Sequence, residues 1–154
     1  MTTWATRFAT CFGVGYFPIA SGTVASAVAL PFAWLLVPYG WTWLFGATFV
    51  VTLMGIWACG VHAKKVRVND PSECVIDEVA GQWLALLPAA LAHRQDWRPY
   101  LMAFFLFRLF DILKPWPLSA AERLPGGLGI MMDDVLAGLI AAACLYVMFY
   151  IRLI

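Results

Sequence analysis

The sequence predicts an all-α fold, a polytopic membrane bundle of about five helices. Hydrophobic residues make up 63% of the 154 residues and charged residues only 12%, about half of the charged fraction of a typical soluble domain. The mean hydropathy is +0.81, and several apolar runs approach the roughly 20 residues that a helix needs to cross a bilayer. We therefore expect residues 1–154 to form a single membrane-embedded domain.

Three apolar runs predict helices that cross the membrane. They cover about residues 23–37, residues 41–63 and the stretch from Asp134 to the C-terminus. Pro38 and Gly40, which favour turns, separate the first run from the second. The length and composition of each run make it a candidate membrane span.

The third expected helix has a recognisable start. Asp70 is a suitable N-cap, Pro71 suits the first helical position, and Glu73 completes a pattern like a capping box. From there we expect the helix to continue through Asp77 and Glu78 to about residue 92. Pro88 is expected to kink it, because proline lacks the N–H that continues a helix.

The fourth expected helix starts near Pro99 and ends where Lys114-Pro115-Trp116-Pro117 forbids continuation. The purely apolar portions of the third and fourth helices are short for a membrane span. A re-entrant path is therefore the alternative to a full crossing for both helices.

Basic residues in the short loops predict the orientation. Lys64, Lys65 and Arg67 follow the second helix, whereas the loop around residues 38–40 is uncharged. Because cytoplasmic loops carry an excess of Lys and Arg, we expect the loop after the second helix in the cytoplasm, together with Arg7 and the N-terminus. This topology brings the start of the third helix, the end of the fourth and the start of the fifth to the cytoplasmic face.

Five of the nine acidic residues lie at the edges of apolar runs on that face: Asp77, Glu78, Asp111, Asp133 and Asp134. Carboxylates are costly in a membrane, and they usually pair, bind ions or line a polar site. In a poorly hydrated place they repel one another unless a counter-charge is present. Mg²⁺ prefers oxygen ligands and is commonly held by carboxylates together with substrate phosphate oxygens. We therefore expect these five residues to form a Mg²⁺ site.

Basic residues and glycines near the acids indicate a phosphate ligand. Lys114 and Arg108 each lie three residues from Asp111, so all three share one side of a helix. Arg108 offers a planar fork for phosphate oxygens and Lys114 a point charge. A glycine-rich stretch ending in Gly22 and Thr23 precedes the first helix, where backbone N–H groups suit an anion.

Each of these groups also has a purely structural interpretation. Asp133 suits the N-cap of the fifth helix, Asp111 an ion pair with a basic neighbour on its helix, and Asp77-Glu78 a solvated first turn. We interpret the two histidines, His62 and His93, as residues of the membrane interface. The joint occurrence of acids, cations and glycines favours a functional site.

Four stretches carry these polar residues in order along the chain: Gly13-x-Gly15-x-x-Pro18-x-Ala20-x-Gly22-Thr23, Asp77-Glu78-x-x-Gly81, Phe107-Arg108-x-Phe110-Asp111-x-x-Lys114-Pro115-x-Pro117 and Gly129-Ile130-Met131-x-Asp133-Asp134-x-x-Ala137-Gly138. Together they resemble the motifs of the phosphatidylglycerophosphatase A family. The resemblance implies a multi-pass, Mg²⁺-dependent phosphatase of the bacterial inner membrane that converts phosphatidylglycerol phosphate to phosphatidylglycerol. Two positions depart from the family: Ser21 stands where it usually has proline, and Ala25 where it often has glycine.

This interpretation assigns expected roles to the polar residues. The catalytic residues would be Asp111, Asp134, Asp133, Glu78 and Lys114, and the phosphate ligands Gly22, Thr23, Arg108 and Lys114. Two routes stay open: one acid activates a water molecule, or one acid attacks phosphorus to form an aspartyl phosphate. The lipid phosphomonoester lies in the headgroup layer, so a site at the cytoplasmic membrane level reaches it without extracting the lipid.

Rival functions fit the same composition. A small ion- or proton-coupled transporter also places acids in membrane helices, although near the midplane. An alcohol phosphotransferase of lipid synthesis needs an Asp-Gly-x-x-Ala-Arg motif, which this sequence lacks. A structural membrane subunit would use the polar groups as contacts between helices. The net charge of +1 provides no basic surface for nucleic acid, so the expected partners are the lipid bilayer and a lipid substrate. No pattern encodes the oligomeric state.

Overall fold

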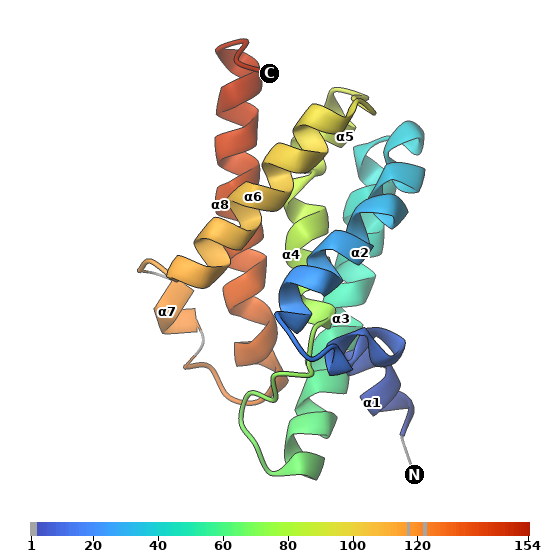
Figure 1. Ribbon diagram of the computed structural model, residues 1–154, viewed down its shortest axis with the longest axis vertical. Coiled ribbons are helices and arrows are strands. Elements are labelled where there is room, and N and C mark those ends of the chain that lie inside the picture. The colour runs from blue at the N-terminus through green and yellow to red at the C-terminus, as the bar shows by residue number, and fades with distance from the viewer. Residues whose placement is uncertain (1–2, 117, 122) are drawn as a thin grey trace.

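The computed structural model describes residues 3–116, 118–121 and 123–154. Within these residues every regular element is a helix and there is no strand, which confirms the all-α class. The elements are α1 (Trp4–Ala9), the 3-10 helix η1 (Cys11–Tyr16), α2 (Ser21–Leu36), the 3-10 helix η2 (Val37–Tyr39), α3 (Trp41–Val66), α4 (Ile76–Ala85), α5 (Leu87–Leu91), α6 (Trp97–Leu113), α7 (Leu118–Ala121) and α8 (Gly127–Tyr150). Figure 1 shows α4 surrounded by the longer helices of the bundle.

Three helical stretches of the described chain are long and apolar enough to cross a membrane: Ser21–Tyr39, Trp41–Val66 and Gly127–Tyr150. They correspond to the three runs that the sequence indicated as spans. The third expected helix is divided into α4 and α5, and the fourth is α6. The short elements α1, η1 and α7 were not expected from the sequence.

The fifth expected helix begins much earlier than predicted. α8 starts at Gly127, after Gly126 with a positive φ of 62°, so Asp133 and Asp134 lie well inside the helix. The interpretation of Asp133 as an N-cap is therefore wrong. A side chain at Gly127 would collide with the Ile56 carbonyl of α3. The absence of a side chain thus lets the first turn of α8 pack directly on the backbone of α3.

The third expected helix begins later than predicted. α4 starts at Ile76, and its N-cap Val75 makes no capping side-chain hydrogen bond. The residues from 67 to 75 instead run back along the molecule, and the Val75 N–H donates to the Ala9 carbonyl at 2.9 Å. The capping box from Asp70 to Glu73 is therefore wrong, because the Glu73 carboxylate lies 3.1 Å from the His62 ring.

One proline ends a helix where expected, and another interrupts a helix that was expected only to kink. α4 ends at Ala85, and Pro88 is the second residue of α5, so the predicted kink is a break between two helices. α6 begins at Trp97, two residues before Pro99, and ends at Leu113. Lys114 then takes a left-handed conformation with a φ of 42°, and Pro115 follows it.

Two glycines bring α4 and α8 into backbone contact. A Cβ on Gly81 would meet the Phe107 ring and come within 2.7 Å of the Asp134 carbonyl, and a Cβ on Gly138 would meet the Gly81 carbonyl. Between membrane helices, where lipid is as apolar as the side chains, small residues of this kind permit close approach. The crossing of α4 and α8 is therefore fixed by backbone packing.

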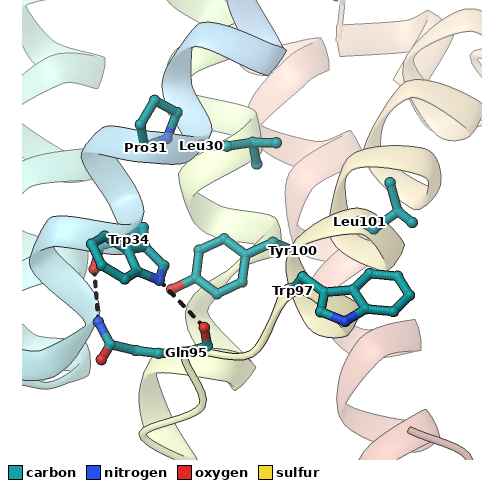
Figure 2. A pocket seen from close by; sticks show the side chains of 7 residues that line it. All are labelled: Leu30, Pro31, Trp34, Gln95, Trp97, Tyr100 and Leu101. Atoms are coloured by element: carbon teal, nitrogen blue, oxygen red, sulfur yellow. Dashed lines mark hydrogen bonds between the residues drawn. The ribbon is translucent and has the colours of Figure 1, made fainter.

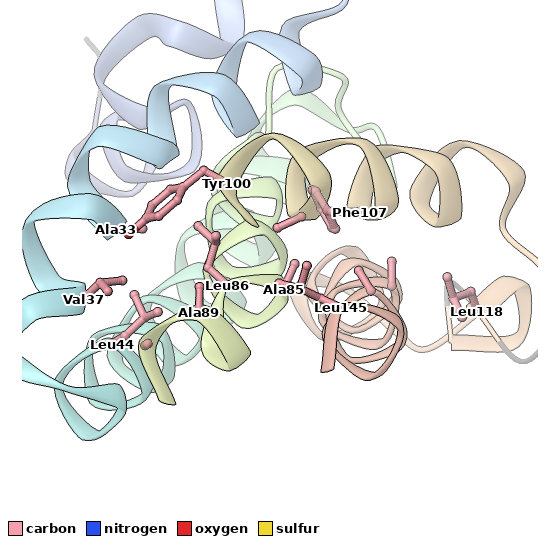
Figure 3. Packing of buried hydrophobic residues seen from close by; sticks show 14 residues of the cluster. Ala33, Val37, Leu44, Ala85, Leu86, Ala89, Tyr100, Phe107, Leu118 and Leu145 are labelled. Carbon is pink, nitrogen blue, oxygen red and sulfur yellow. The ribbon is translucent and has the colours of Figure 1, made fainter. Parts of the chain in front are cut away.

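The main hydrophobic core extends from the crossing of α4 and α8 toward the C-terminal end of α8. Phe107, Leu86, Leu44 and Leu145 are fully buried there, and Figure 3 shows them converging from α6, the α4–α5 junction, α3 and α8. A second cluster, which includes Cys59, Ala80 and Met131, joins α3, α4 and α8. Both clusters include residues at or next to α4, which makes it the central element of the bundle.

An aromatic pocket of about 430 Å³ lies near the C-terminal end of α2. Figure 2 shows Trp34 and Gln95 joined by two hydrogen bonds: the Trp34 indole N–H donates to the Gln95 carbonyl at 3.3 Å, and the Gln95 amide donates to the Trp34 carbonyl at 3.1 Å. Trp97 and Tyr100 also line this pocket. Its residue Trp34 is 12 residues along α2 from Gly22, and none of the described residues that line it is acidic, so we do not assign the chemistry to it.

Candidate active site

Three carboxylates meet where α4 and α8 come together. Asp77, Glu78 and Asp134 each offer an oxygen atom, and these atoms lie within 4.8 Å of one another. Gly81 and Gly138 follow Asp77 and Asp134 by four residues each, which is about one helical turn. The glycine crossing therefore holds the two acidic turns opposite each other.

The first turn of α2 packs against this cluster. A Cβ on Gly22 would collide with the Glu78 carboxylate and come within 3.3 Å of Arg108 Nη1. Glycine at this position thus lets the start of α2 approach both an acid and a cation. Thr23 is the next residue and is half-buried. Ala20, directly before α2, has a left-handed backbone with a φ of 50°.

Two cations border the acids. Arg108 Nη1 lies 2.7 Å from Asp111 Oδ2 on α6, and Lys114 Nζ donates to Asp133 Oδ2 at 2.8 Å. The ion pair between Asp111 and Arg108 that the sequence allowed is therefore present. Besides Asp77, the charged neighbours of Asp134 include Glu78, Asp111 and Asp133, so the paired acids adjoin the three-carboxylate cluster.

Charge is not balanced within this group. Five carboxylates, those of Asp77, Glu78, Asp111, Asp133 and Asp134, face the two cations Arg108 and Lys114. All five are buried or half-buried. Carboxylates removed from water stay ionised only where positive charge or hydrogen-bond donors compensate them. With all side chains ionised the group has an excess of negative charge, which an additional cation would compensate.

Several polar atoms of the group lack hydrogen-bond partners among the described residues. They include Glu78 Oε2, Asp133 Oδ1 and Arg108 Nε, all of which are buried. Buried polar atoms in proteins are nearly always paired, so unpaired ones need an explanation such as an ion or a ligand. An all-oxygen set of carboxylates with free acceptor atoms suits a hard divalent cation. The residues present therefore fit a metal such as Mg²⁺.

Gln82 is a candidate site residue that the sequence analysis missed. It is fully buried, and neither atom of its side-chain amide has a partner among the described residues. It lies four residues after Glu78 on α4 and so on the same face of the helix. A helical side chain also leans toward the preceding turn, which directs the amide to the Glu78 side of the helix. The available signal was this spacing of an amide and an acid in an otherwise apolar stretch.

His62 has a structural role that the sequence analysis did not foresee. Its expected place at the membrane interface stays a prediction, and within the protein its side chain is buried. Its Nδ1 lies 3.3 Å from Thr6 Oγ1, and its Nε2 lies 3.1 Å from Glu73 Oε1. These contacts join α1, α3 and the loop before α4. His62 thus holds the segment that leads into the acidic turn of α4.

The structure brings together most of the site residues that the sequence indicated. Gly22, Asp77, Glu78, Arg108, Asp111, Lys114, Asp133 and Asp134 form one connected group from α2, α4, α6 and α8 and the residue that follows α6. Thr23 adjoins it through Gly22. The starts of α2, α4 and α8 and the end of α6 lie in the lower half of Figure 1.

Comparison with known proteins gives this arrangement a context. The family model for phosphatidylglycerophosphatase A matches residues 7–149. A phosphatidylglycerophosphatase A of Escherichia coli is 36% identical over 136 residues, which cover 88% of this chain and 77% of that protein. A second one, from Haemophilus influenzae, is 38% identical over 104 residues, or 67% of this chain and 62% of that protein.

A third relative carries a different name. A protein of Bacteroides thetaiotaomicron, provisionally named a phosphatidylinositol-3-phosphatase, is 41% identical over 136 residues, which cover 84% of this chain and 83% of that protein. No solved structure matches the chain. The family model covers nearly the whole chain, including every acidic and basic residue of the site. The chain therefore belongs to the phosphatidylglycerophosphatase A family of phosphatases.

Proposed function

We propose that this membrane protein hydrolyses phosphatidylglycerol phosphate to phosphatidylglycerol and phosphate, and that it requires Mg²⁺. The observation that carries the proposal is the buried group of Asp77, Glu78 and Asp134, flanked by Arg108 and Lys114. Acids that hold a metal and cations that neutralise phosphate oxygens can together stabilise the charge that develops during phosphomonoester hydrolysis. The names of the Escherichia coli and Haemophilus influenzae relatives suggest phosphatidylglycerol phosphate as the lipid substrate.

The metal would be held by Asp77, Glu78 and Asp134, whose oxygen atoms already lie within 4.8 Å of one another. Asp111 and Asp133 adjoin them and are further candidate ligands. When bound, Mg²⁺ supplies positive charge that polarises a phosphoryl oxygen. The free Oε2 of Glu78 and the free Oδ1 of Asp133 are the acceptor atoms that the protein offers without breaking an existing hydrogen bond.

The basic residues would bind the substrate phosphate. Lys114 and Arg108 are each held by an acid, Asp133 and Asp111 respectively, so their charges are positioned before the substrate arrives. Arg108 also has an unpaired Nε, which offers phosphate a planar donor. The backbone of Gly22 and Thr23 at the start of α2 would add N–H donors to the same phosphate.

One carboxylate of the group would have one of two roles: it would activate a water molecule as general base, or it would attack phosphorus itself. The candidates are Asp111, Asp133 and Asp134. The unpaired amide of Gln82 would hydrogen-bond the water or a phosphate oxygen from the interior side of the site. Asp133 and Asp134 lie several residues inside α8 and are buried, so they are excluded from bulk water, which strengthens their electrostatic effect.

The proposed location is the bacterial inner membrane, with several crossings and the active site toward the cytoplasm. Lys64 and Lys65 are in the last turn of α3 and Arg67 follows it, and such residues favour the cytoplasmic side. Figure 1 shows α8 beginning in the same lower half of the bundle that holds the end of α3, and the loop after α3 leading back up to the start of α4. A site at this level would meet a phosphate in the headgroup layer.

The test is phosphate release by the purified protein in detergent. We expect release from phosphatidylglycerol phosphate, loss of release with a chelator, and recovery with Mg²⁺. Glu78→Gln and Asp134→Asn should each lower kcat at least 100-fold, a common cost of removing one strong electrostatic group. Asp96→Asn is the matched control, because Asp96 lies in the loop before α6 and pairs with Arg94.

The substrate panel separates two candidate specificities. The Bacteroides relative makes an inositol lipid phosphate a second candidate, so phosphatidylinositol 3-phosphate and phosphatidic acid should be compared at equal concentration. Preference for phosphatidylglycerol phosphate supports the proposal. Wild-type turnover in both carboxylate variants would reject the metal site. Preference for the inositol lipid phosphate would show that it, and not phosphatidylglycerol phosphate, is the substrate.

A further inference from the structure

An apolar groove of about 540 Å³ separates α2 from α3. Val28 and Phe32 line it on α2, and Val51 and Met54 line it on α3. Every side chain that lines the groove is hydrophobic. The two helices approach each other only at a few positions, so α4 forms the floor of the groove between them.

The groove begins next to the acidic turn of α4. Ile76 and Val79 line its floor, and they flank Asp77 and Glu78 in the sequence. Trp83 lies one turn further along α4, and its indole N–H donates to the Ala29 carbonyl of α2 at 2.9 Å. This hydrogen bond fixes the ring at one end of the floor. Ile76 and Trp83 are seven residues apart, so the groove follows α4 over a rise of about 10 Å.

A second observation connects the groove to the site. Cys11 of η1 lines the groove, and burial together with the negative charge of Glu78 raises the pKa of its thiol to about 12. The Glu78 carboxylate therefore acts electrostatically on a wall of the groove. One side of the acidic turn thus faces Gly22 and Arg108, and the adjacent side faces the apolar groove.

The surroundings indicate what occupies this groove. α2 and α3 both belong to stretches that are long and apolar enough to cross a membrane, so a gap between them opens onto hydrocarbon. Val28 and Phe32 are both exposed at its edge. We propose that the groove binds an acyl chain of the phospholipid substrate and thereby orients its phosphate toward Glu78. This assignment rests on the proposed function and adds the site for the lipid tail.

The energetic role of such a groove differs from that of a pocket in a soluble enzyme. An acyl chain that leaves the bilayer for the groove exchanges one apolar environment for another, so it gains little hydrophobic free energy. The benefit is orientation, because a fixed chain limits the positions that the attached phosphate visits. Blocking the groove should therefore reduce turnover of long-chain substrates most.

Two neighbouring residues of α3 provide a matched test. Val51 lines the groove, whereas Val50 is 53% exposed and does not. Val51→Trp should lower kcat/KM for a 16-carbon phosphatidylglycerol phosphate, relative to a 6-carbon one, on the order of tenfold, as expected for a lost fit in an apolar pocket. Val50→Trp adds the same bulk outside the groove and should leave that ratio unchanged. Val28→Trp blocks the groove from α2 if Val51→Trp does not fold.

A second measurement does not depend on turnover. The wild-type protein in phosphatidylcholine liposomes is irradiated with a phosphatidylglycerol phosphate that carries a photoreactive group in one acyl chain. Labelling should favour Val51 and Met54 over Val50 and Leu53, the outward residues of the same helix, which are each 53% exposed. Unlabelled phosphatidylglycerol phosphate should suppress this labelling, and extra phosphatidylcholine should not.

The outcomes separate the groove from the reaction. Equal labelling of the inward and outward residues, equal competition by phosphatidylcholine, or equal substrate ratios for Val51→Trp and Val50→Trp would overturn the groove assignment while leaving the phosphatase intact. Specific groove labelling without any phosphate release by the wild-type protein would support the groove and reject the proposed hydrolysis.

Discussion

Replacing Gly22 by alanine is expected to disable the active site without unfolding the protein. The added Cβ would lie 2.9 Å from Glu78 Cδ, whereas ordinary van der Waals contact begins at 3.4 Å. Because the same Cβ would also overlap Glu78 Oε1, the carboxyl group must move by more than the roughly 0.5 Å that this difference gives. A misplacement of about 1 Å costs catalysis on the order of 100-fold, so we expect kcat to fall roughly tenfold or more.

Stability should change little in the same variant. The obstructing atoms belong to the end of a side chain, which moves more easily than backbone, and alanine favours a helix over glycine by about 0.5–1 kcal/mol. Gly46→Ala is the matched control, because a Cβ there meets nothing within 4 Å. Gly81→Ala is the opposite case, because its Cβ would come within 2.7 Å of the Asp134 backbone carbonyl, and it should lose folded protein.

The assay is phosphate release from phosphatidylglycerol phosphate, combined with thermal unfolding followed by tryptophan fluorescence in the same detergent. We expect Gly46→Ala to match the wild type in both, Gly22→Ala to lose kcat with a Tm close to the wild type, and Gly81→Ala to lose Tm. A Gly22→Ala protein with wild-type kcat would refute the assignment of Glu78 to the reaction. If the activity of Gly22→Ala falls only in proportion to the amount of folded protein, displacement of the Glu78 carboxylate is refuted as the cause.

Three further predictions follow from the same group. Gln82→Met should raise Tm, because it removes a buried unpaired amide that costs about 1–3 kcal/mol, and should lower kcat; an unchanged kcat would remove Gln82 from the site. Lys114→Met should lower kcat/KM, because the substrate phosphate loses a cation that binds it; an unchanged kcat/KM in steady-state kinetics would remove Lys114 from the phosphate site. Mg²⁺ should raise Tm by mass action in the wild type and not in Asp134→Asn, and equal shifts in thermal unfolding would reject Asp134 as a ligand.

The sequence predicted the membrane helices well because their signal is local. A run of about 20 apolar residues is visible without knowledge of packing, and the three predicted spans correspond to the three candidate spans of the structure. The end of α6 before Pro115 was predictable for the same reason, since proline acts on its own backbone, whereas at Pro88 only a kink was predicted and the helix is broken. These features depend on few distant contacts.

The helix starts were predicted poorly because they depend on contacts between distant segments. The pattern at Asp70 and Glu73 has the form of a cap, but Glu73 reaches His62 on another helix and the segment stays outside α4. Asp133 resembles a cap because it follows a glycine-rich stretch, yet that stretch is the first turn of α8, packed on the α3 backbone. In both cases a tertiary contact decided the boundary against the local preference.

The placement of the acids at glycine crossings explains why these residue types occur at this spacing. Asp77 precedes Gly81 by one turn on α4, and Asp134 precedes Gly138 by one turn on α8, while the two glycines touch at the crossing. Without glycine the helices would stand further apart, and the acid oxygens would not lie within 4.8 Å of one another. Membrane helices gain no hydrophobic attraction to offset the repulsion between such acids. The backbone contact therefore maintains the acidic cluster, and a bound cation would stabilise both the contact and the cluster.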